Sequence, residues 1–215
     1  MPLKVPISVQ HYTRRWAAAL LCGLLPLTTV WAETSVTPYA GWVFGGRAQS
    51  DSGELRLRDA SSQGLLLEMP YAGSDWRSLR LAFSRYYTRL DEFPDDGGPR
   101  RTRFDLRVDD VQLGGTTTIV DGWLRSYLLG SFGLTRFRPD DPAYNSETLF
   151  SFSLGLGLRK SLGRHWAINL QGRVLMPINV DGGSLFCGGG SCDLRLRGDA
   201  VFTQAEVGLG IGLRF

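Results

Sequence analysis

Histidine is the side chain that enzymes most often use to move protons near neutral pH, and this sequence contains two histidines. His11 lies in an N-terminal segment that we expect to be removed, which leaves His165 in the predicted turn Ser-Leu-Gly-Arg-His. A general base needs a partner group within reach, so a single histidine in a turn is more typical of a solvated polar residue. We therefore predict no catalytic residues. Chemistry by carboxylates alone stays open, with four candidates: Asp95, Asp96, Asp109 and Asp110.

Cys187 and Cys192 bracket the sequence Gly-Gly-Gly-Ser in a long connection. Their spacing, together with the export argued below, predicts a disulfide. The closed loop is so short that its effect on the unfolded chain would be on the order of 2 kcal/mol. No further metal ligands lie nearby, so we expect neither a metal nor a cofactor. A redox switch is the alternative, although this spacing is not that of a thioredoxin motif.

Residues 1–32 have the three parts of a secretory signal peptide: a basic start, an apolar run over 16–31, and the small residue Ala32 at the cleavage site. The remaining residues, 33–215, suit one domain. The basic residues lost with the signal are Lys4, Arg14 and Arg15. Removing these three from 24 basic residues leaves as many as the 21 acidic ones, so the net charge gives no reason to expect nucleic acid as a partner.

Eight segments of about ten residues alternate between apolar and polar residues, as β-strands do. They cover 36–46, 63–70, 77–90, 104–119, 124–137, 147–160, 166–178 and 201–215. Short connections at 72–76, 120–123 and 161–165 alternate with long ones at 47–62, 91–103, 138–146 and 179–200. Short turns on one side and long loops on the other predict an all-β fold, an eight-stranded antiparallel up-and-down transmembrane β-barrel with both termini on the short-turn side.

Alternation alone does not say which face of a strand lies inside, and a soluble β-sandwich is the competing interpretation. The polar faces are rich in glycine, which saves volume in a narrow barrel but weakens a solvated strand. Aromatic residues also gather near the strand ends, as at a membrane interface. These aromatic residues are Trp42, Trp76, Trp123, Tyr127, Trp166 and Phe215. Both observations favour the barrel with its apolar faces outward.

This orientation places a network of charges in the barrel interior. Its predicted members are Arg80, Arg125, Arg159, Arg173 and Arg214, with Glu68, Asp110 and Glu206 as partners. The interior of an eight-stranded barrel is just wide enough to be filled by side chains, and an unpaired charge there is costly. We therefore expect a salt-bridged plug. The alternative is a narrow ion path, or a gate that opens when pairs exchange.

The signal peptide, the eight alternating segments and the C-terminal aromatic residue resemble the small outer-membrane barrels of the OmpA/OmpX/OmpW type from Gram-negative bacteria. The resemblance implies a location in the outer membrane with both termini in the periplasm. It also implies that the apolar stripe at the C-terminus is read by the barrel-assembly machinery. The residues of that stripe are Leu209, Ile211, Leu213 and Phe215. Enzymes of this membrane use a histidine with a serine or an aspartate near the long loops, whereas His165 lies on the opposite side.

The leading expectation is a non-enzymatic structural or surface-interaction protein that presents four loops outside the cell. Its expected partners are outer-membrane lipid and lipopolysaccharide, whose phosphates could meet Arg100, Arg101 and Arg103 of the second long loop. Two alternatives stay open: a channel or conduit for small or apolar molecules, as in OmpW-like relatives, and a lipid-modifying enzyme.

Overall fold

A computed structural model describes residues 34–50, 53–71, 74, 76–94, 97–178, 184–185, 194–195 and 202–215. The chain from Glu33 to Phe215 is one compact unit. The predicted signal peptide lies outside the described residues, as do Cys187, Cys192, Asp95 and Asp96. None of the described residues belongs to a helix long and apolar enough to cross a membrane.

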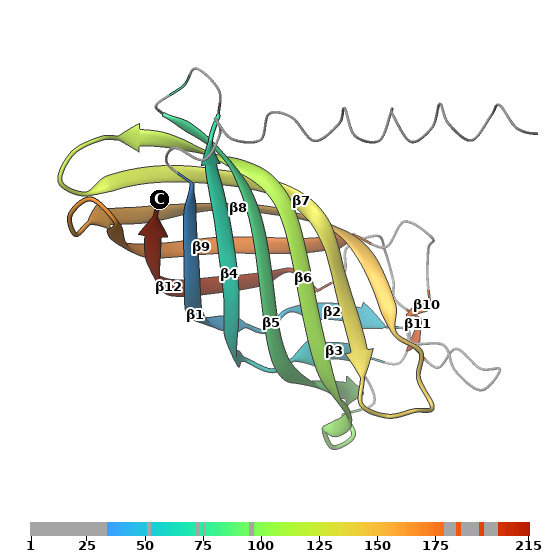
Figure 1. Cartoon of the computed structure of the whole chain (residues 1–215). Helices are drawn as coiled ribbons and strands as arrows, with labels where there is room; N and C mark the ends of the chain where they lie inside the picture. The colour runs from blue at the N-terminus through green and yellow to red at the C-terminus, as the bar shows by residue number, and fades with distance from the viewer. Residues whose placement is uncertain are drawn as a thin grey trace, which may run out of the picture. The chain divides into compact units, whose positions relative to one another are not determined.

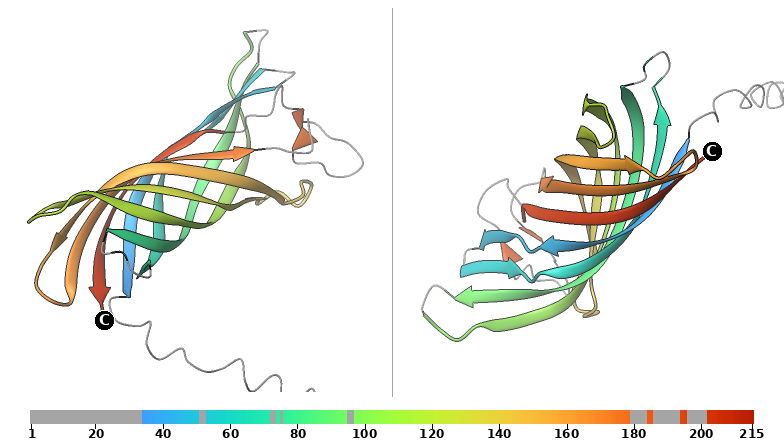
Figure 2. Two further views of the ribbon diagram at one scale, coloured as in Figure 1. Left: turned by 90° about the horizontal axis from the view of Figure 1, so that it is seen from above. Right: turned by 90° about the vertical axis from the view of Figure 1, so that its left-hand side faces the viewer.

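Eight long strands form a closed ring in which every pair is antiparallel (Figures 1 and 2). Each strand pairs with its neighbours in the sequence, and β12 pairs with β1 to close the ring. The predicted eight-stranded antiparallel barrel is thus confirmed. The strands are β1 (Ser35–Phe44), β4 (Ala60–Pro70), β5 (Arg77–Pro94), β6 (Arg101–Val120), β7 (Arg125–Pro139), β8 (Glu147–Ser161), β9 (Trp166–Ile178) and β12 (Gln204–Arg214).

The barrel wall is longer at the long-loop end than the sequence predicted. The expected loop 47–62 contains β2 (Arg47–Ser50) and β3 (Gly53–Leu57), and β3 pairs with the last residues of β5, from Leu90 to Pro94. Charged residues such as Arg56 made this segment look like a loop, although Leu55 and Leu57 beside it are fully buried. Two further short strands, β10 (Ser184–Leu185) and β11 (Leu194–Arg195), pair with each other.

The apolar faces lie outside the barrel. Along β8 the outward side chains of Leu154 and Leu156 are each 61% exposed, whereas the inward Ser151 and Ser153 are buried. On β12, Leu209 and Ile211 are each 57% exposed and alternate with buried glycines. A soluble sandwich would show the reverse pattern, with its large apolar side chains buried.

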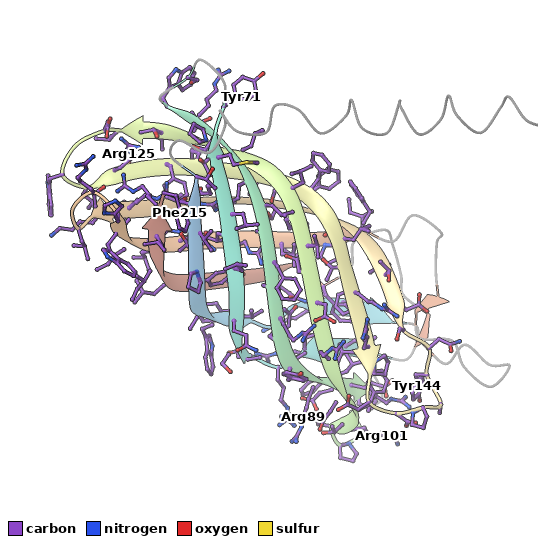
Figure 3. All side chains as sticks on the ribbon, viewed as in Figure 1. Tyr71, Arg89, Arg101, Arg125, Tyr144 and Phe215 are labelled. Carbon is purple, nitrogen blue, oxygen red and sulfur yellow. The ribbon has the colours of Figure 1, made fainter. Side chains whose placement is uncertain are left out.

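Four of the predicted interface aromatics, the tryptophans, are exposed. Phe215 is exposed too, and Figure 3 shows it at one end of the barrel. Tyr127 is not exposed: it is buried in the barrel interior, and its hydroxyl donates a hydrogen bond to Asn169 at 2.7 Å. The sequence misled here because Tyr127 and Leu128 are both apolar, so the face of this strand end was ambiguous.

Glycines on the inner face make room for large side chains. Gly157 is the cross-strand neighbour of Tyr127, and a methyl group at Gly157 would overlap the tyrosine ring. In the same way Tyr39 packs against Gly208, where an added Cβ would lie 2.8 Å from the ring. Glycine therefore lets this narrow barrel hold tyrosines that would not otherwise fit.

Candidate functional site: the charged interior and the two barrel ends

The first layer of the interior is built around Glu68 on β4, near the short-turn end. Arg80 of β5 is its direct cross-strand neighbour and donates to it from Nη2 at 2.9 Å and from Nε at 3.1 Å. Arg159 reaches the same carboxylate from β8, on the other side of the ring. Glu68 and Arg80 are nearly inaccessible to solvent. This layer ties separate parts of the barrel wall together through one buried carboxylate.

Tyr127 lies against this first layer. The guanidinium carbons of Arg80 and Arg159 lie 5.1 Å and 5.3 Å from its ring centroid, within the range of cation–π contacts. Arg80 also donates from Nη1 to Gln171 at 3.0 Å. Both charged and apolar atoms thus fill the lumen at this level.

The second layer is organised by Arg173 on β9, which extends across the lumen. Its Nε lies 2.6 Å from Glu206 of the neighbouring β12, and its Nη1 lies 3.1 Å from Asp110 of β6. Its Nη2 donates to Ser84 of β5 at 2.9 Å. A buried charge of this kind is tolerated only when it is paired and hydrogen-bonded, and Arg173 meets both conditions.

Polar side chains of β6, β7 and β8 complete the second layer. Thr135 and Gln112 donate to the same oxygen of Asp110, at 2.9 Å and 2.8 Å. Gln112 and Thr135 both also contact the hydroxyl of Ser151. All four of these side chains have no measurable solvent exposure. These four side chains therefore form one buried hydrogen-bonded network at the centre of the barrel.

Beyond the second layer, the interior at the long-loop end contains an apolar cluster, which the sequence analysis missed. Buried apolar side chains from β1 to β8 pack together there, and Phe202 joins them. The cluster is Val43, Ala48, Leu55, Leu57, Ala60, Tyr86, Leu90, Phe104, Leu106, Val108, Phe137, Leu149 and Phe202. The sequence of 104–113 does contain an indication of this cluster. Before Asp109 and Asp110 the apolar residues have inward positions, and after them the apolar residues have outward positions.

Two predicted members of the interior network lie at its edge, at the open short-turn end of the barrel. Arg125 pairs with Asp121 of its own turn at 2.9 Å and is 39% exposed, and Arg214 donates to the hydroxyl of Ser161. Both are strand-end residues, where the barrel opens to solvent, and in the described part of the chain neither forms an ion pair with Glu68, Asp110 or Glu206. With Arg77 and with Glu68 and Arg159 of the first layer, they line a polar cavity of about 530 Å³ at the end that carries Phe215 (Figure 3).

The single histidine of the described residues lies at the short-turn end of the barrel. His165 is exposed in the short turn before β9 and lines the cavity just described. Among the described residues, its imidazole has no hydrogen bond to a carboxylate or a hydroxyl. The described part of the chain also contains no group of three or more His, Cys, Asp or Glu side chains that could hold a metal ion.

Two of the three predicted lipid-contacting arginines of the second long loop, Arg100 and Arg103, have acidic partners, whereas Arg101 is exposed. Arg100 and Arg103 bind Asp91 and Glu92 at 2.5 Å, and Arg58 binds Asp91 at 2.7 Å. Burial favours the neutral form of Asp91, but hydrogen bonds from Arg58, Thr102 and Arg100 outweigh it and lower the pKa of that carboxyl. These arginines hold the long-loop end together.

No known protein-family model matches the sequence, and a comparison with curated proteins finds no relative. Solved structures do match. The outer membrane protein OprG from Pseudomonas aeruginosa superposes with a TM-score of 0.58 at 11% identity, over 86% of this chain and 96% of OprG. The chain has the fold of a small outer-membrane β-barrel. Neisserial surface protein A gives a TM-score of 0.54 at 13% identity, over 85% of this chain and 97% of that protein. Identities this low establish the fold alone.

Proposed function

We propose that the protein is a non-enzymatic barrel of the outer membrane, closed to water, that presents its long connections outside the cell. The observation that carries this proposal is the burial of the two charged layers. A water-filled channel would leave lumen-facing side chains accessible, whereas Asp110 and Gln112 have no exposure and Glu206 has 4%. Paired charges in such a site act as a plug.

The outer surface supports a membrane location. The outward residues of β8 from Phe150 to Leu158 are all apolar, a run of nine residues along the strand. A tilted transmembrane strand needs about 9–11 residues. Each of the eight long strands also pairs with a strand on both sides, which is the condition for backbone to lie in lipid. Two structures with this fold, described above, are an outer membrane protein and a surface protein.

The termini indicate the direction of insertion. Phe215 donates its amide hydrogen to the carbonyl of Thr34 at 3.0 Å, so both described chain ends lie at the short-turn end. With residues 1–32 as an export signal, this end faces the periplasm and the long loops face outward. Leu209, Ile211 and Phe215 are exposed along the last strand, where acyl chains and the assembly machinery can contact them.

Reconstitution tests the proposal directly. The protein refolded into detergent should enter lipid bilayers, and single-channel recordings should show no steady large openings. A protein that stays monomeric and soluble without detergent would contradict the membrane location. Steady conductance from the folded barrel would instead contradict only the plug.

One observation favours a second candidate, a conduit for apolar molecules. The interior at the long-loop end is lined by the apolar cluster around Phe137 and Leu106, a surface suited to an apolar solute. Because these side chains are packed against one another, a solute would have to displace some of them. Uptake of an apolar fluorescent reporter into liposomes that contain the barrel, compared with empty liposomes, would distinguish the conduit from the closed barrel.

A further inference from the structure

On three neighbouring strands, β5, β6 and β7, the outward residues change from apolar to charged at the same level of the barrel. Going toward the long loops, the outward residue after Phe83 on β5 is Arg85, and the one after Leu134 on β7 is Arg136. On β6, Val111 gives way to Asp109. The strand register places Arg85 opposite Asp109 and Asp109 opposite Arg136, so these three residues form one row across the outer surface.

A second row of cations lies directly above the first. Arg107 of β6 is opposite Arg138 of β7, and Tyr87 of β5 is opposite Arg107. We call the four outward arginines of the two rows the arginine band; they are Arg85, Arg107, Arg136 and Arg138. The band is local rather than a ring, since its cross-strand neighbours on β4 and β8 are the uncharged Gln63 and Thr148.

The charge of the arginine band is not balanced by the described residues. Asp109 forms ion pairs with three of the four arginines: Arg85 at 2.5 Å, Arg107 at 3.0 Å and Arg138 at 3.9 Å. Arg136 is exposed and pairs with no acidic residue in the described part of the chain. Like charges directly opposite each other, as at Arg107 and Arg138, are unfavourable in an antiparallel pair. The band therefore lacks an anion.

The residues around the arginine band indicate the chemical class of the anion that it would bind. The outward side chains immediately below it are Phe83, Val111 and Leu134, which belong to the apolar belt. If the belt spans the membrane as proposed above, the guanidiniums lie at the headgroup level of the outer leaflet. Arginine binds phosphate in bidentate fashion, so an amphiphile with a phosphate above and acyl chains below fits both surfaces at once.

Tyr87 adds a site for the rest of a headgroup. Its side chain is 62% exposed beside Arg107. It also lines a hollow of about 370 Å³ with Arg89, Asp105 and Asp140, at the end where Figure 3 shows Arg89. An exposed aromatic ring with hydrogen-bonding groups beside it is suited to a sugar.

We propose that the arginine band and Tyr87 bind a phosphorylated glycolipid of the outer leaflet, with its phosphate on the guanidiniums and its sugar against Tyr87. This rests on the proposed membrane location and orientation. It moves the predicted lipopolysaccharide contact from the loop, where Arg100 and Arg103 are paired with Asp91 and Glu92, to the outer wall of β5, β6 and β7.

The test measures saturable binding to the refolded protein in detergent micelles, with lipid A as the probe. The variant is Arg136→Gln combined with Arg85→Gln. The matched control is Arg164→Gln at the opposite end, which is also exposed and has no ion pair among the described residues. We expect the double variant to bind lipid A about tenfold more weakly than the parent protein, since two charge-assisted contacts are lost. The control variant should bind lipid A as the parent does. Tyr87→Ala should weaken binding of lipid A but not of phosphatidylglycerol.

Three further probes separate the sources of the phosphate. Dephosphorylated lipid A should bind poorly, and inorganic phosphate should bind too weakly to compete. Equal binding of intact and dephosphorylated lipid A, or no effect of the double variant, would overturn the site. Phosphatidylglycerol binding as tightly as lipid A would overturn the glycolipid assignment. These results leave the membrane location intact, whereas failure of the parent protein to insert into bilayers would refute both proposals.

Discussion

Replacing Arg173 with methionine tests whether the second charged layer holds the barrel shut. Methionine keeps much of the side-chain length but removes the two ion pairs, to Glu206 at 2.6 Å and Asp110 at 3.1 Å, and the hydrogen bond to Ser84. Both carboxylates would remain buried without a cation. Breaking a buried pair in this way costs about 3–5 kcal/mol.

The remaining hydrogen bonds place the expected cost near the lower part of that range. Glu206 keeps the donor Ser62 at 2.6 Å, and Asp110 keeps Thr135 and Gln112. With a denaturant slope of about 2 kcal/mol per molar urea, a loss of about 3 kcal/mol lowers the unfolding midpoint by about 1.5 M. Tryptophan fluorescence of the refolded barrel in micelles, followed through a urea titration, measures this shift.

Arg125→Met is the matched control, because Arg125 forms the same type of ion pair at an exposed position. Its side chain is 39% exposed and its partner Asp121 is 67% exposed, so its loss should cost about 0–1 kcal/mol. A triple variant with Arg173→Met, Glu206→Gln and Asp110→Asn should recover most of the loss, since it buries no unpaired charge. The reasoning fails if Arg173→Met unfolds at the same urea concentration as Arg125→Met.

Three further predictions concern other parts of the barrel. Gly157→Ala should destabilise the protein in the same urea assay because its methyl group overlaps the ring of Tyr127, and adding Tyr127→Ala should relieve that clash. The pKa of Asp91 is lower in the folded protein than in the unfolded chain, where it is near 4. The ionised carboxylate therefore stabilises the fold above about pH 4, and this stabilisation is lost as the pH falls through the lower pKa of the folded protein. Asp91→Asn should remove this contribution to the acid dependence of stability. Phe215→Ala should reduce the yield of membrane-inserted protein in cells more than it reduces the stability of protein refolded in vitro, and equal effects on both would argue against an assembly signal.

The strand pattern could be predicted from the sequence because apolar and polar residues alternate with a period of two along each strand. Leu154 and its neighbours on β8 alternate with serine and glycine without interruption, so both the strand and its outward face could be predicted. Tyr127 could not be placed in this way, since the next residue, Leu128, is apolar too. Arg125 and Arg214 have the inward parity of their strands, but parity does not reveal how close a residue lies to the open end of the barrel.

The apolar interior at the long-loop end escaped prediction for a related reason. On β6, the inward residues are Leu106 and Val108 above the charged layer and Asp110 and Gln112 within it. The outward residues change in the opposite sense, from Arg107 and Asp109 to Val111 and Leu113. Apolar and polar residues still alternate with a period of two along β6, but the apolar residues change from inward to outward positions. A search for alternation alone therefore finds one strand and misses this change of face.

That reversal has a physical meaning if the barrel spans a bilayer. A strand that leaves the hydrocarbon must place polar groups outward, where water and headgroups can solvate them, and its interior then becomes the natural place for apolar side chains. On β5 and β7, Arg85 and Arg136 mark the same level as Asp109 on β6. The level at which the outward residues change from apolar to charged thus indicates the position of the membrane surface. The arginine band follows from it, because cations just above the belt lie where phosphates are expected. Lipid-accessible quenchers attached at known depths should therefore quench a fluorophore placed at Val111 more strongly than one placed at Arg107, and equal quenching would mean that the membrane boundary lies elsewhere.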